Sequence, residues 1–96
     1  MTVTFTAYVA GDDMAAAVTQ RIGELCAGRA VEVDITVVDV KADPAAAESV
    51  NVIALPTVVR ESPFPRKRVI GQLDDDRRCA EALGLDAYPV SVGGPA

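Results

Sequence analysis

The sequence predicts an α/β fold in which four strands form one mixed sheet with helices on both of its faces. Three observations predict it: an alternating segment at 3–10, a striped helical segment after it, and a second apolar segment from residue 31. Two strands joined by a helix form a right-handed parallel βαβ unit. With the later elements the order is βαβαββα, and the expected strand order is 2-1-3-4.

The first half of the chain carries strong local signals. Residues 3–10 alternate between apolar and polar, and Gly11 ends the strand. Asp12 or Asp13 can cap the helix that follows, and both favour its N-terminal dipole. The apolar stripe of that helix recurs every four residues, at Met14, Val18, Ile22 and Cys26.

The second strand, predicted over 31–40, changes its pattern along its length. It alternates at Val31, Val33 and Ile35 and then becomes nearly continuously apolar from Val37 to Val40. This change predicts a strand that is half exposed at one end and covered on both faces at the other.

The second half is signalled mainly by capping and turn residues. Asp43-Pro44 starts a second helix, because Asp is a good N-cap and Pro suits the first helical position. Two short strands follow at 57–60 and 66–71, joined by a Pro-rich turn at 62–65. Asp74 to Asp76 begin a last helix that runs to about residue 83. We expect one domain over 1–85 and a flexible C-terminal tail over 86–96.

This element order is that of thioredoxin, but the catalytic chemistry of thioredoxin is absent. That chemistry needs two cysteines spaced C-x-x-C at the start of the first helix, where the dipole lowers a thiol pKa. The position reads Gly11-Asp12-Asp13-Met14, and the cysteines are Cys26 and Cys79. The chain has no histidine, so a zinc site has almost no ligands. We expect no catalytic residue, no metal and no cofactor.

The charge distribution points to a protein partner. The net charge of −5 disfavours nucleic acid and anionic membranes, and there is no long apolar run and no basic leader, so we expect a cytoplasmic protein. Positive charge gathers at Arg60, Arg66, Lys67 and Arg68. These residues either dock an acidic partner or protect an edge strand from aggregation, and the sequence leaves both readings open.

Five motifs in register over about residues 5–85 carry a family resemblance. They are Tyr8-Val9-Ala10-Gly11, Val38-Asp39-Val40 followed by Asp43-Pro44, Ala54-Leu55-Pro56-Thr57, Pro63-Phe64-Pro65 with its basic run, and Val69-Ile70-Gly71-Gln72-Leu73. In this order and spacing the chain resembles the KaiB family. It departs from the family at Gln72, where Asp is usual, and in its short tail.

The resemblance implies a non-catalytic adaptor that binds and regulates KaiC, a hexameric ATPase and kinase, in circadian-type or stress regulation. KaiA-like and histidine-kinase partners are also implied. Contact residues carried over by position are Asn51, Arg60, Arg66, Lys67 and Arg68. The family also switches fold, between the thioredoxin-like form and a βαββααβ form that assembles as a dimer or tetramer.

Conformational control is expected at Pro56, Gly71 and Gln72, because glycine admits unusual backbone angles and X-Pro bonds isomerise slowly. The proline at this place in thioredoxin-like proteins is usually cis, so we expect a cis Leu55–Pro56 bond. Two other functions stay open: a thioredoxin-like redox or glutathione-handling protein, and an interaction domain of the sensor-kinase type.

Overall fold

The structure is a computed structural model that describes residues 1–48, 54–71 and 73–90. The predicted element order is confirmed. The elements are β1 (Thr2–Val9), α1 (Asp12–Cys26), β2 (Glu32–Asp39), α2 (Pro44–Glu48), β3 (Thr57–Ser62), β4 (Lys67–Ile70), α3 (Asp76–Ala82) and the 3-10 helix η1 (Leu85–Ala87).

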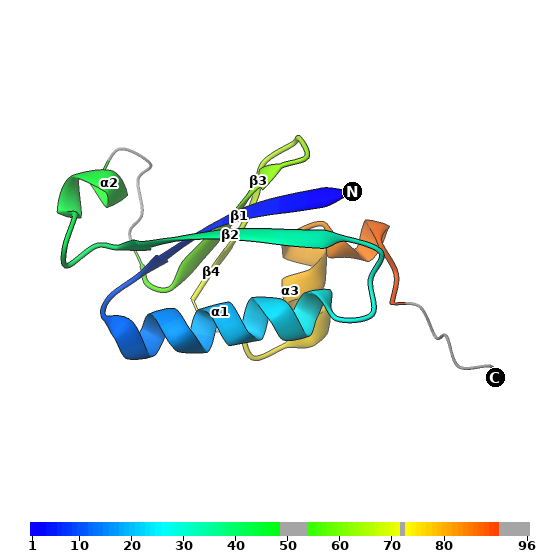
Figure 1. Ribbon diagram of the computed structural model, residues 1–96, viewed down its shortest axis with the longest axis horizontal. Coiled ribbons are helices and arrows are strands. Elements are labelled where there is room, and N and C mark those ends of the chain that lie inside the picture. Colours follow the sequence, from blue (N-terminus) through cyan, green and yellow to red (C-terminus); the bar gives the residue numbers. More distant parts are fainter. Residues whose placement is uncertain (49–53, 72, 91–96) are drawn as a thin grey trace.

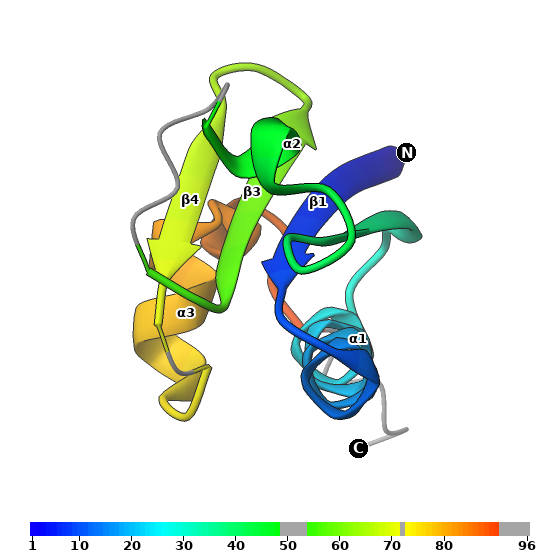
Figure 2. The ribbon, with the colours of Figure 1, turned by 90° about the vertical axis from the view of Figure 1, so that its left-hand side faces the viewer.

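The four strands form one mixed sheet in the predicted order β2-β1-β3-β4. β1 is parallel to β2 and antiparallel to β3, and β3 and β4 form an antiparallel hairpin. Both α1 and α3 lie on one face of this sheet, and the short α2 lies on the other side at one end (Figures 1 and 2). We call the face under α1 and α3 the helix-covered face and the other the open face.

The core lies between the helix-covered face and the two longer helices. Alternate residues of β1 from Val3 to Val9 are fully buried there, and Ile22 of α1 packs into the same cluster. The apolar face of α3 is thin, but Leu83 and Leu85 beyond its end are also fully buried. Two leucines after a short helix therefore anchor the C-terminal part of the domain to the core.

Helix starts show which aspartates cap and which do not. Asp75 is the N-cap of α3, and its Oδ1 accepts from the backbone N–H of Arg78 at 3.0 Å. Asp43 accepts in the same way from Ala46 at 3.3 Å. At α1 the predicted aspartate cap is wrong: Gly11 occupies the N-cap position without a side-chain hydrogen bond. Asp12 and Asp13 lie inside the first turn, where they favour the helix dipole.

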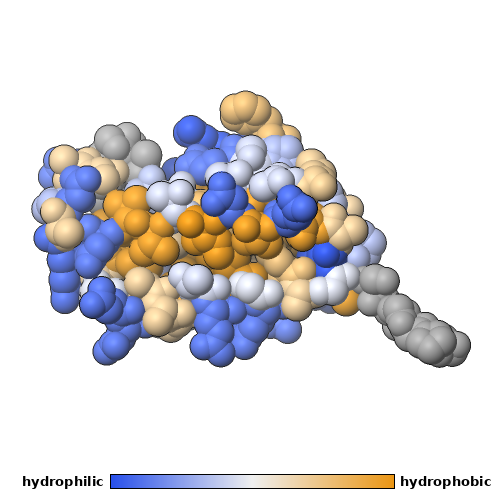
Figure 3. Space-filling view, viewed as in Figure 1, coloured by the Kyte–Doolittle hydropathy of each residue, from blue (hydrophilic) through white to orange (hydrophobic). Residues whose placement is uncertain are grey.

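β2 differs from its prediction because it lies at the edge of the sheet. Its apolar C-terminal end is not covered on both faces, since Val37 is 41% exposed; Val33, near the start of the strand, is 37% exposed. Figure 3 shows a broad apolar band on the face of the molecule where β2 and α1 lie. The continuous apolar run therefore marks an exposed edge in this protein.

The end of the domain is held by one arginine. Arg29, just after α1, donates to the backbone oxygens of Leu85 and Tyr88, each at 2.7 Å. The helix η1 thus spans the boundary that we predicted between domain and tail, and the chain stays attached to the body as far as Tyr88. Within the described ranges, no helix combines the length and apolar content needed to cross a membrane.

Candidate partner-binding surface

The predicted basic residues lie on the β3–β4 hairpin, which we call the basic hairpin (residues 57–70). Arg60 pairs with Lys67 across the two strands, and Val59 pairs with Arg68. Because side chains alternate between the faces of a strand, Arg66 and Arg68 belong to the open face, and Arg60 and Lys67 to the helix-covered face. Alternation therefore divides the four cations into two pairs on opposite sides of the sheet, although Lys67, at the start of β4, also lines the hollow on the open face.

A small hollow of about 160 Å³ marks the open face of the basic hairpin. Glu61 is the extra residue of β3 where the register with β1 shifts between Thr4 and Phe5. Its carboxylate accepts from the Thr6 hydroxyl at 3.0 Å and meets Arg66 Nε at 3.0 Å. The hollow is lined by Tyr8, Val59, Glu61, Arg66, Lys67 and Arg68.

The electrostatics of this hollow are positive. Three cations and one carboxylate line it, and within the part of the chain that the structure describes neither Lys67 nor Arg68 has a carboxylate at ion-pair distance. Burial raises the pKa of the Tyr8 hydroxyl, and the Glu61 carboxylate adds to that rise. Tyr8 is therefore a neutral hydrogen-bonding group beside an excess of positive charge.

Arg60 has a different environment from the other three cations. Its side chain is only 4% exposed, and the guanidinium donates to the carbonyl of Pro65 at 2.8 Å and approaches that of Gly84 at 3.5 Å. Its Nε makes no hydrogen bond to any described residue. Arg60 links the hairpin turn to the end of α3, so in this structure its charge is largely hidden from a partner.

Phe64 is a surface residue that the sequence reasoning did not select. It lies in the hairpin turn and is 82% exposed, the most exposed of the large apolar side chains described. Both Ser62–Pro63 and Phe64–Pro65 are cis peptide bonds. The signal was present in the sequence, because an aromatic residue between two prolines in a turn has no strand or helix to bury it.

The predicted conformational residues meet at the other end of the basic hairpin. Leu55–Pro56 is cis, as expected, and the Pro56 carbonyl accepts from the Gly71 backbone N–H at 2.8 Å. Gly71 has a φ of +87°, a conformation that other residues adopt at a cost. The remaining predicted residues, Asn51 and Gln72, lie outside the described residues.

Thiol and metal chemistry have no assembled site among the described residues. The start of α1 presents carboxylates, and Met14 Sδ accepts from the backbone N–H of Ala10 there. Cys26 and Cys79 are free and buried at other places, and burial raises the pKa of both thiols. No group of three or more potential metal ligands occurs in the described part of the chain.

The fold is thioredoxin-like, with a charged hairpin and without a cysteine pair at the start of α1. The model of the KaiB domain matches residues 7–85, which is most of the chain. The protein belongs to the KaiB family, which is generally non-catalytic. No curated protein matches the chain in sequence.

Solved structures agree with this fold. The solution structure of the N-terminal domain of SasA from Synechococcus elongatus is similar, with a TM-score of 0.71 and 19% identity over 98% of this chain and 89% of that one. Chloroplastic thioredoxin z gives a TM-score of 0.58 with 22% identity, over 88% of this chain and 77% of that one. A malarial protein gives a TM-score of 0.54 with 16% identity, over 86% of this chain and 98% of that one. At these identities the likeness shows the fold.

Proposed function

We propose that this protein is a non-catalytic adaptor that binds and regulates a KaiC-like hexameric ATPase in the cytoplasm. The observation that carries the proposal is the basic hairpin of a KaiB-family domain: Arg66, Lys67 and Arg68 are exposed beside Phe64 on a chain with a net charge of −5. Concentrated positive charge on an acidic protein favours an acidic protein partner and speeds encounter with it.

The arrangement has the parts of a protein–protein contact. Exposed aromatic and arginine side chains supply most hot spots, because they bury a large area and form several hydrogen bonds. Phe64 supplies apolar area at the turn, and the guanidinium groups of Arg66 and Arg68 supply charge and directed donors on the adjacent open face. Lys67 adds positive potential at the hollow, the buried Arg60 supports the hairpin turn, and Asn51 stays a predicted contact.

The experiment is co-precipitation, followed by kinetic binding, with the KaiC-like ATPase of the same organism in the presence of ATP or ADP. Exchanging both open-face cations, Arg66→Glu with Arg68→Glu, should slow association by about tenfold, because charge on an interface acts mainly on the on-rate. Phe64→Ala should speed dissociation and weaken binding by about tenfold, as truncation of an aromatic anchor does.

Arg77→Glu is the control, matched in charge to the single exchange Arg68→Glu, because each changes the net charge by two units. Arg77 is 90% exposed on α3 and pairs with Glu81 on its own helix, so this variant changes the net charge without touching the basic hairpin. Binding by Arg77→Glu should stay close to that of the native chain. If the control and hairpin variants lose affinity equally, the hairpin is not the contact. If no complex forms with either ATP or ADP present, the proposed partner is wrong.

We also propose that the second half of the domain rearranges. Its support is local: Pro56 and Gly71 form one hydrogen bond at the base of a short hairpin, and α3 has few apolar residues of its own. A segment with weak local specification is what a two-state element requires. Amide NMR should show slow exchange or a second set of peaks for 55–85, and a single set under all conditions would contradict the switch.

Self-association is a second candidate, favoured by the exposed apolar edge of β2. Val33 and Val37 present apolar surface on a strand with one unpaired side, which is the usual place for strand pairing between chains. Sedimentation analysis should find a dimer that Val37→Lys dissociates. A native chain that stays monomeric at high concentration would rule this candidate out, and the edge would then be free for a KaiA-like or histidine-kinase partner.

A further inference from the structure

A cavity of about 340 Å³ opens between α1 and the segment before α3. One wall is a single face of α1, where Met14, Ala17, Val18 and Arg21 follow one another at helical spacing. The opposite wall is formed by Pro56, Leu73 and Asp74. Its lining is mostly apolar, and its volume lies at the small end of the range for ligand pockets, roughly 300–1,000 Å³.

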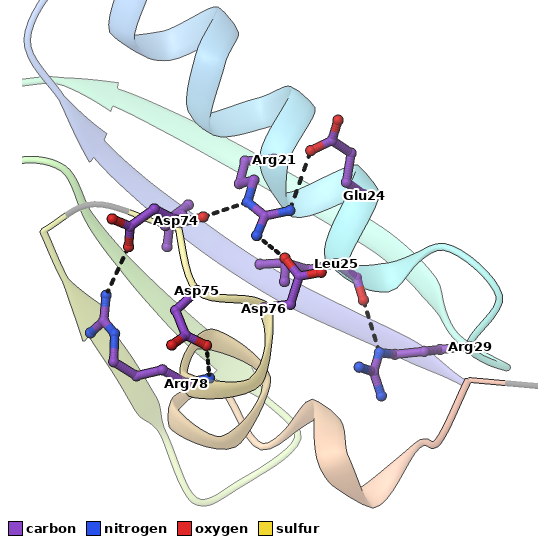
Figure 4. Close-up of polar contacts among 9 residues, drawn as sticks. Arg21, Glu24, Leu25, Arg29, Asp74, Asp75, Asp76 and Arg78 are labelled. Atoms are coloured by element: carbon purple, nitrogen blue, oxygen red, sulfur yellow. Dashed lines mark hydrogen bonds and ion pairs between the residues drawn. The ribbon is translucent and has the colours of Figure 1, made fainter.

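Arg21 closes one end of the cavity and has its charge balanced there. Its guanidinium reaches from α1 across to the second half of the domain (Figure 4). Nε donates to the carbonyl of Leu73, Nη2 pairs with Asp76, and Nη1 lies 3.3 Å from Glu24 Oε1. All three nitrogens are engaged and two carboxylates face one cation, so Arg21 is not available as the partner of an anionic ligand.

The negative charge of the Asp74 carboxylate, by contrast, is only weakly compensated by nearby cations. Its side chain is 79% exposed at the mouth of the cavity, and its ion-pair contact with Arg78 is 3.9 Å long. Figure 4 shows Arg78 on the side of Asp74 away from α1. The cavity therefore combines an apolar interior with a negative rim.

We propose that this cavity binds a compact hydrophobic cation, a small molecule with an aromatic or branched aliphatic body and one amine. The apolar body would lie against Met14, Val18 and Leu73, and the ammonium group would face Asp74. Charge complementarity selects the cation, because the guanidinium in the wall already faces two carboxylates, whereas the Asp74 carboxylate at the rim has one long ion-pair contact, with Arg78. This inference is independent of the proposed partner.

The position of the cavity gives the ligand a structural consequence. Its walls come from both halves of the chain, α1 on one side and residues 56, 73 and 74 on the other. A ligand that binds only when these walls face each other stabilises this arrangement over any state in which they separate. Binding should therefore raise the melting temperature, and the rise should continue with the logarithm of the ligand concentration after the site is saturated.

The test uses the intact chain and three probes that share a phenethyl body and differ in the polar group: phenethylamine, phenethyl alcohol and 3-phenylpropionate. Amide NMR titration should show saturable shifts at Val18 and Leu73, tightest for the amine and weakest for the acid. The amine should bind about two- to fivefold more tightly than the alcohol, the value of one exposed charge pair. Its binding should also raise the melting temperature.

Two variants locate the effect. Asp74→Asn should abolish the preference for the amine over the alcohol while leaving alcohol binding unchanged. Ala17→Phe should fill the cavity and prevent binding of all three probes, and Ala16→Phe is its matched control, because Ala16 is exposed on the same helix and does not line the cavity. Amide spectra of each variant establish that it is folded.

The possible results separate clearly. Equal binding of all three probes, or an unchanged preference in Asp74→Asn, would overturn recognition of a cation. If Ala16→Phe and Ala17→Phe lose probe binding equally, the proposed location is wrong. If phenethylamine causes no saturable shift, the proposed site does not exist.

Discussion

Three glycine-to-alanine substitutions separate backbone strain from side-chain crowding in this domain. Gly84 follows α3 with a φ of +70°, Gly71 follows β4 with a φ of +87°, and Gly23 lies within α1. A β-carbon at Gly23 or Gly71 would have no atom within 4 Å, whereas at Gly84 it would overlap the Arg60 guanidinium and lie 2.9 Å from Lys67 Cδ. Gly71 therefore differs from Gly23 in its positive φ, and Gly84 differs from Gly71 in the side chains that crowd it.

The expected free energies follow from these differences. Gly23→Ala should stabilise the domain by roughly 0.5–1 kcal/mol, because alanine is the better helix residue. Gly71→Ala should destabilise it by about 1–2 kcal/mol, the cost of a left-handed conformation with a β-carbon. Gly84→Ala carries the same cost and also displaces the buried Arg60 from the Pro65 carbonyl, a charged hydrogen bond worth about 1.5–3 kcal/mol. The total cost of Gly84→Ala is about 2.5–5 kcal/mol.

Urea unfolding followed by far-ultraviolet circular dichroism measures all three free energies. The decisive comparison is Gly84→Ala against Gly71→Ala. If the two lose the same free energy, Arg60 moves aside at no cost and its buried position does not stabilise the hairpin. If Gly71→Ala is neutral, the positive φ at the base of the hairpin is not a constraint on this chain.

Two further predictions concern helix capping and alkaline pH. Asp75→Ala removes the acceptor for the Arg78 backbone N–H and should lower the free energy of unfolding in urea by about 1 kcal/mol. Asp12→Ala at α1 should lower it less, because Asp12 is not a cap. Equal losses in the two variants would contradict the capping assignment. Burial raises the pKa of the Cys26 and Cys79 thiols and of the Tyr8 hydroxyl, so the unfolded chain releases these protons at lower pH than the folded chain. The free energy of unfolding should then fall as the pH rises above roughly 8.5, the ordinary thiol value, and a flat profile from pH 7 to 10 would refute this.

Much of the fold was predictable because its signals are local. Alternation in β1, the four-residue stripe of α1 and the Asp-Pro start of α2 each depend on neighbours a few residues away. The absence of a cysteine pair at the start of α1 is also a local fact. The Asp75 cap followed from the same kind of signal, although at α1 Gly11 took the capping position because the strand turns into the helix one residue earlier than expected.

The candidate surface was predictable only in part. Arg66, Lys67 and Arg68 are exposed as expected of charged residues on an edge strand. Arg60 has the same chemistry but is buried, because it shares the helix-covered face with Val58 and its guanidinium reaches Gly84 at the end of α3. That burial depends on how α3 packs against the sheet, and no pattern within β3 announces it.

The sequence by itself determined the element order, the non-thiol start of the first helix and the basic charge of the hairpin, since each is written in adjacent residues. Only the tertiary structure decided that β2 exposes its valines, that Arg60 is buried against Gly84, and that Met14 faces Leu73 across a cavity. These features arise where distant segments meet. Their burial and charge depend on the packing partner, which the local pattern of either segment does not specify.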